Sequence, residues 1–179
     1  MPLRISAVAV ALILAAGCRS RVPGYDRDWY AGGSFTAVPG VGLAAGGGKV
    51  IAHRDTYDWA VEGQIVRHFL DDKDIADDGQ AAHGRMTAVR IGMKHSVSPG
   101  SKRHATFRYG AQFYRATGTP GIVDKPGDYF GAYASFGFET ELSERWTMGP
   151  EFSVALLEGE GSIGWEVVPT FFWHLWFNF

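Results

Sequence analysis

The side chains best suited to covalent chemistry are a histidine and a serine that stand next to each other. His95 and Ser96 supply the residue types of a base and a nucleophile. In an extended strand, however, neighbouring side chains point to opposite faces, so these two cannot act as a pair. Ser98 is better spaced from His95, but Pro99 and Gly100 follow it directly and indicate a turn. We therefore predict a protein that is not an enzyme.

A second set of reactive groups consists of charged residues that recur at alternate positions along the chain. Inside a closed structure, basic groups and carboxylates on one face can neutralise one another as ion pairs. The same charges could instead form a gated path for ions or protons. The predicted interior charge network is Glu62, Arg90, Lys94, Arg108, Glu139, Glu141, Glu151 and Glu166.

The elements that must position these charges show alternation of apolar and polar residues, which is typical of β-strands. The second of them is rich in glycine and alternates poorly. An even number of strands is what the antiparallel closure of a bacterial barrel requires. We therefore predict an all-β fold, an eight-stranded antiparallel transmembrane up-and-down β-barrel, with strands at 29–38, 41–53, 59–70, 87–97, 105–114, 129–142, 146–156 and 164–179.

The two faces of these strands differ in chemistry. In segments such as 105–114 and 129–142, one face is apolar and aromatic while the other carries the charges. In a small lumen Arg and Glu can pair, whereas rows of aromatic rings would overfill it. We therefore expect the apolar face to point outward, towards lipid, around a polar and filled lumen. The reverse arrangement would give a soluble, lipid-anchored barrel that binds a ligand, which is an alternative.

The chain ends in a strand with an apolar residue at every second position and a terminal phenylalanine. The alternating residues are Phe171, Trp173, Leu175, Phe177 and Phe179. This run resembles the C-terminal assembly signal of bacterial outer-membrane barrels. In size and pattern the chain resembles the OmpA/OmpX/Opa-like eight-stranded class. The resemblance implies a place in the bacterial outer membrane and insertion by the barrel assembly machinery.

The first residues have the composition of an export signal. Arg4 precedes an apolar run from Ile5 to Ala16, which is too short to span a bilayer comfortably. The ending "LAAGC" resembles a bacterial lipobox, which implies that Cys18 is lipidated. We expect a signal peptide at 1–17, a lipidated tether at 18–28 and the barrel at 29–179, with the lipid in the periplasmic leaflet. The alternative is an ordinary signal peptide and an incidental free cysteine.

Three arginines fall on the apolar face of neighbouring strands, within a few residues of the expected outer loops. They are Arg67, Arg85 and Arg115. A charge near the membrane interface costs little, and a guanidinium matches a phosphate by paired hydrogen bonds. In an outer membrane this predicts a rim that binds lipopolysaccharide. The alternative is that the arginines extend into water without a specific partner.

Composition excludes several functions. The 17 Lys and Arg nearly balance the 19 Asp and Glu, which argues against a nucleic-acid partner. A single cysteine forms no intramolecular disulfide, and the motifs of nucleotide or metal binding are missing, so we expect no cofactor and no metal. The prediction is a monomeric outer-membrane barrel with a structural, adhesive or surface-interaction role that is not a large-pore channel. The enzymatic alternative is a lipid A-modifying barrel similar to the outer-membrane deacylases.

Overall fold

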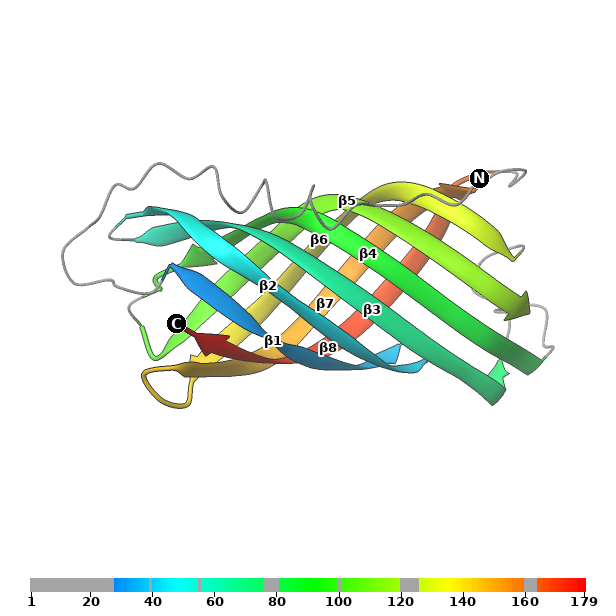
Figure 1. The fold of residues 1–179 in the computed structure, drawn as a ribbon, viewed down its shortest axis with the longest axis horizontal. Helices are drawn as coiled ribbons and strands as arrows, with labels where there is room; N and C mark the ends of the chain where they lie inside the picture. The colour runs from blue at the N-terminus through cyan, green and yellow to red at the C-terminus, as the bar shows by residue number, and fades with distance from the viewer. Residues whose placement is uncertain are drawn as a thin grey trace.

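Period-two alternation gives a strand at each of the eight predicted places in the computed structural model. The structure describes residues 28–38, 40–54, 56–75, 81–99, 101–119, 126–159 and 164–179. Each strand pairs antiparallel with the next, and β8 pairs with β1, so the sheet closes into a barrel (Figure 1). This confirms the predicted fold. The strands are β1 (Trp29–Val38), β2 (Val41–His53), β3 (Tyr57–Ile75), β4 (Ala81–Val97), β5 (Arg103–Thr119), β6 (Gly127–Glu141), β7 (Trp146–Gly159) and β8 (Glu166–Asn178).

Side chains alternate between the exterior and the interior along each strand. On β6, Phe130, Phe136 and Phe138 are exposed on the outside, whereas Tyr133 and Glu139 are buried inside. Apolar residues outside and charged residues inside are the arrangement that the alternation predicts. Among the described residues, no helix is long and apolar enough to cross a membrane.

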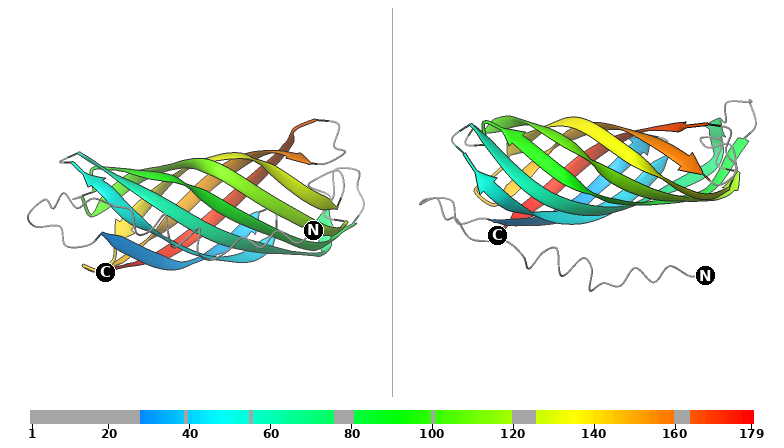
Figure 2. Two further views of the ribbon diagram at one scale, coloured as in Figure 1. Left: turned by 45° about the horizontal axis from the view of Figure 1, so that its top comes forward. Right: turned by 90° about the horizontal axis from the view of Figure 1, so that it is seen from above.

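The two ends of the barrel differ in their connections. One end, which we call the terminal end, carries Phe179 and the short turns after β2, β4 and β6 (Figures 1 and 2). The opposite end, which we call the loop end, carries the connections after β1, β3, β5 and β7. Five strands extend farther towards the loop end than predicted: β3, β4, β5, β6 and β7, with the longest extensions on β3, β4 and β5. Their predicted limits were wrong because backbone hydrogen bonds can continue a ladder after apolar alternation has stopped.

The interior is filled by two layers of different chemistry. Nearer the loop end, the buried side chains are mainly apolar and include Met86, Tyr114, Leu157 and Phe172. Nearer the terminal end, charged side chains dominate. The lumen was predicted to be polar and filled, and it is filled; the apolar layer is a further finding that the alternation did not reveal. It follows from apolar and aromatic residues at interior positions: Met86 and Leu157 in the extended parts of β4 and β7, and Tyr114 and Phe172 within the predicted strands.

The glycine-rich strand β2 makes room for a tyrosine. Tyr30, Gly48 and Glu62 lie opposite one another on β1, β2 and β3. The Tyr30 hydroxyl donates a hydrogen bond of 2.7 Å to Glu62 Oε2. A Cβ atom added at Gly48 would lie 2.5 Å from the Tyr30 Oη atom, which is far inside van der Waals contact. Glycine at this position therefore lets the tyrosine cross β2 to reach the carboxylate.

Replacing Gly48 with alanine is expected to lower the free energy of unfolding by about 1–3 kcal/mol, because the methyl group forces Tyr30 away from Glu62. Urea titration of the barrel in lipid vesicles, followed by mobility on unboiled gels, measures this change. Gly63→Ala is the matched control, since its added Cβ meets nothing closer than the Arg90 carbonyl oxygen at 3.7 Å. Equal losses in both variants would contradict this account of β2.

Candidate functional site

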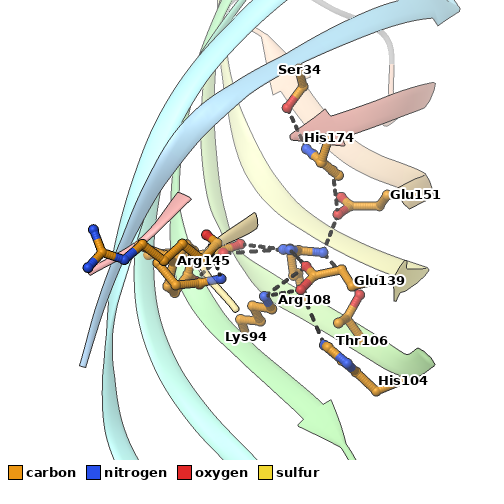
Figure 3. A network of polar contacts seen from close by, with 12 residues as sticks. Ser34, Lys94, His104, Thr106, Arg108, Glu139, Arg145, Glu151 and His174 are labelled. Atoms are coloured by element: carbon orange, nitrogen blue, oxygen red, sulfur yellow. Dashed lines mark hydrogen bonds and ion pairs between the residues drawn. The ribbon is translucent and has the colours of Figure 1, made fainter. Parts of the chain in front are cut away.

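The centre of the charged layer is the guanidinium of Arg108 on β5. Its Nη1 lies 2.5 Å from Glu151 Oε2, its Nη2 lies 2.7 Å from Glu139 Oε1, and its Nε lies 3.0 Å from Glu62 Oε1. The three carboxylates come from β7, β6 and β3 and converge on one cation. Figure 3 shows Glu139 and Glu151 beside Arg108. All four side chains are at least nine-tenths buried. Closure of the barrel is what brings these strands around a common lumen.

Further groups extend the network from two of these carboxylates. Lys94 Nζ lies 2.7 Å from Glu139 Oε1, and His104 Nε2 lies 3.3 Å from Glu139 Oε2. On the other side, His174 Nε2 lies 2.8 Å from Glu151 Oε2 (Figure 3). The network therefore reaches from β4 and β5 across the lumen to β8.

Arg90 occupies the boundary between the charged and apolar layers. Its Nε donates a hydrogen bond of 2.6 Å to Gln112 Oε1. The guanidinium carbon lies 4.9 Å from the centre of the Tyr133 ring and 4.7 Å from that of Phe172. Its Nη1 atom has no hydrogen-bond partner among the described residues. Arg90, Lys94 and Arg108 together match the charge of the three buried carboxylates, so the interior is close to electrically neutral.

The structure does not bring all eight predicted network residues together. Glu141 is only half-buried and lines a pocket of about 120 Å³ at the terminal end. Glu166 begins β8 at the loop end. Both share the interior parity of the other charges, but they lie at opposite mouths of the lumen. An interior-facing charge therefore joins the Arg108 network only if it also lies at the right depth along the barrel.

Sequence reasoning missed a row formed by Ser34, His174 and Glu151. Ser34 Oγ is hydrogen-bonded to His174 Nδ1, and His174 Nε2 bonds Glu151. The residue types match those of a hydrolytic triad. All three side chains are more than nine-tenths buried, and Glu151 already pairs with Arg108. We interpret the row as part of the interior packing. No signal in the sequence points to it, because Ser34 and His174 meet only when β8 closes on β1.

His95 and Ser96 point to opposite faces, as strand geometry requires. Ser96 is buried in the lumen, whereas the His95 ring stacks on the outward Trp59 with centroids 4.5 Å apart. Among the described residues, no three His, Cys, Asp or Glu side chains are grouped as a metal site would require.

The three arginines of the predicted rim lie on one side of the barrel. Arg67, Thr87 and Arg115 are opposite one another on β3, β4 and β5, and Arg85 lies two residues closer to the loop end on β4. All three arginines are exposed on the outer face. Arg115 pairs with Asp128 through two hydrogen bonds of 2.6 and 2.7 Å. We name this group, Arg67, Arg85 and Arg115, the arginine rim.

The residues of the predicted assembly signal form the outward face of β8, next to the seam with β1. Trp173 lies opposite Phe35, Leu175 opposite Gly33 and Phe177 opposite Ala31. The backbone amide of Phe179 donates a hydrogen bond of 2.9 Å to the Trp29 carbonyl. Cys18 and the predicted signal peptide lie outside the described residues.

Comparison with known proteins identifies no family for this chain, so its function has to be inferred from its architecture. No protein-family model matches the chain, and no curated protein was found to be similar to it. What stands is an eight-stranded antiparallel β-barrel with an apolar exterior and a buried network of charges.

Proposed function

We propose that this protein is a bacterial outer-membrane β-barrel lipoprotein, anchored through Cys18, with a structural or surface-interaction role and no catalytic activity. The observation that carries the proposal is the exterior, on which large apolar side chains are exposed on all eight strands. Leu43 is 64% exposed and Phe130 is 62% exposed. Soluble monomers rarely expose apolar patches larger than a few hundred Å². Exposing apolar side chains to water is unfavourable, and a lipid environment removes this cost.

The limits of the apolar exterior support the same proposal. At the terminal end the outward side chains include Trp29, Tyr57, Trp59 and Trp146, which are amphipathic aromatics suited to an interface. At the loop end, the arginine rim, Asp128 and Glu158 are exposed. The exterior therefore has a polar border and an aromatic border. Such borders are expected where a barrel meets the two surfaces of a membrane.

The filled interior supports a role other than that of a large-pore channel. The Arg108 network occupies the part near the terminal end, and the apolar layer with Tyr114 and Phe172 occupies the part near the loop end. An interior of this kind leaves the loops and the exterior as the surfaces that can meet partners. On the exterior, we propose that the arginine rim binds the phosphates of lipopolysaccharide by charge-assisted hydrogen bonds.

Membrane fractionation of cells that express the whole chain tests the proposal. We expect the protein in the outer-membrane fraction, with a folded form that migrates differently on boiled and unboiled gels. Cys18→Ala is expected to lose lipid labelling while still forming the heat-sensitive barrel, because insertion of the strands does not require the lipid anchor. Lipid A mass spectra should be identical with and without the protein. Recovery of the barrel as a soluble periplasmic protein would refute the proposal. So would a change in lipid A that the wild-type protein causes and the Ser34→Ala variant does not.

A further inference from the structure

The apolar exterior contains a hollow over strands β1 and β2. Its floor consists of small outward residues, Ala31 and Gly33 on β1 and Ala45 on β2. It is an open hollow with a volume of about 930 Å³, and bulky side chains also line it. They include Phe35, Leu43, Ile65, Trp173, Leu175 and Phe177.

The barrel backbone does not require the floor to be this small. A Cβ atom added at Gly32, the inward neighbour, would clash with the Leu175 carbonyl oxygen of β8, so glycine is needed at that position. A Cβ atom added at Gly33 meets only the Ala44 carbonyl oxygen, at 3.4 Å, which is ordinary contact. A larger residue at 33 would fit and would fill the hollow. The hollow is therefore not a by-product of strand packing.

The guanidinium of Arg67 lies at the loop end of the hollow. Arg67 lines it, opposite Leu43 in the strand register, and its guanidinium carbon lies 5.5 Å from the centre of the Phe69 ring. Among the described residues, Arg67 has no carboxylate partner, whereas Arg115 at the same height is paired with Asp128. An anion stabilises a guanidinium that loses water against an apolar surface. The lining supplies none, since it contains no Asp or Glu.

We propose that the hollow binds an acyl chain of a phosphorylated, multiply acylated lipid of the outer leaflet, with the lipid phosphate on Arg67. This inference rests on the proposed function and assigns a defined site to part of the arginine rim. From Phe35 to Ala31 the lining of the hollow follows four residues of β1, or ~13 Å, in the direction away from the loops. An anionic head at Arg67 would thus direct its chain along the floor.

The charge of the lining favours a lipid over a second copy of the chain. A symmetric contact through this face would bring two Arg67 side chains into one apolar interface, and no lining carboxylate could pair with them. An anionic lipid supplies the missing charge and an apolar chain in the same molecule.

Native mass spectrometry of the whole barrel, released from detergent micelles that contain bisphosphorylated lipid A, tests the site. Wild-type protein should retain one lipid A copy and should retain phosphatidylcholine much less. Gly33→Leu/Ala45→Leu fills the hollow, and Arg67→Gln removes the cation. Each is expected to lower the retained fraction about tenfold, which corresponds to ~1.4 kcal/mol of binding free energy.

The matched control is Ala111→Leu/Ala132→Leu, which adds two leucines to exposed outward positions on β5 and β6, away from the hollow. It should retain lipid A like wild type, and the heat-sensitive gel shift shows that each variant is folded. Equal retention by the filled-hollow variant, or equal retention of phosphatidylcholine, would overturn the inference. Failure of the proposed function looks different, because the wild-type protein would then be missing from the outer membrane altogether.

Discussion

Replacing Arg108 with methionine is expected to lower the free energy of unfolding by about 3–5 kcal/mol, which is the usual cost of leaving a buried charge without its partner. The loss should be this large because one guanidinium contacts Glu62, Glu139 and Glu151, each within 3.0 Å. Removing it leaves Lys94 as the cation that still pairs with one of them. Urea titration in lipid vesicles, with the folded fraction read from unboiled gels, measures the change.

The matched control for this prediction is Arg90→Met. Arg90 is equally buried, but its contacts are the Gln112 amide and two aromatic rings. The same substitution should therefore cost clearly less at 90 than at 108. Adding Glu151→Gln to Arg108→Met restores the balance of charge and should recover part of the loss. Similar losses at both arginines would show that packing volume, and not charge compensation, stabilises the interior.

Replacing Phe179 with alanine is expected to lower the amount of folded barrel in the outer membrane several-fold without changing folding into pure lipid vesicles. The ring is 56% exposed, so its loss removes little internal packing, and the backbone bonds between residues 179 and 29 remain possible. The expected loss arises because the proposed assembly machinery reads the terminal ring. Quantification of heat-sensitive protein in outer-membrane fractions measures it.

Phe130→Ala is the control for the terminal residue, because Phe130 is an outward ring of similar exposure on β6. Its folded yield in cells should stay close to that of wild type. A drop of the same size in both variants would attribute the effect to lost contact with lipid. An unchanged yield for Phe179→Ala would count against the assembly-signal interpretation.

Alternation was sufficient to predict the fold because parity alone decides which face a strand residue occupies. It placed Arg108 and Glu139 in the interior, and the structure has both there. Parity could not separate Glu139 from Glu141, which share a face on one strand but differ in depth. Only Glu139 lies at the height of Arg108, and Glu141 reaches the mouth. The depth of a side chain along the barrel depends on strand tilt and register, and neither can be read from the sequence of one strand.

Features that depend on closure were also beyond sequence reasoning. The bond between Ser34 and His174 joins the first strand to the last. The hollow needs the small residues of β1 and β2 beside the large residues of β8, and this neighbourhood exists only in the ring. The apolar layer of the lumen likewise collects Met86, Tyr114 and Phe172 from three separate strands. These arrangements are properties of the whole ring.

The composition of the Arg108 network has a consequence for the order of events during biogenesis. Its ion pairs join β3, β4, β5, β6 and β7, so the charges neutralise one another only after these strands curve around a common lumen. An open sheet would present these charges, together with two unpaired backbone edges, to hydrocarbon. For the membrane barrel proposed above, we therefore expect partial entry into a bilayer to be unfavourable. We expect a truncated chain to stay in water and the complete molecule to enter in a nearly all-or-none step.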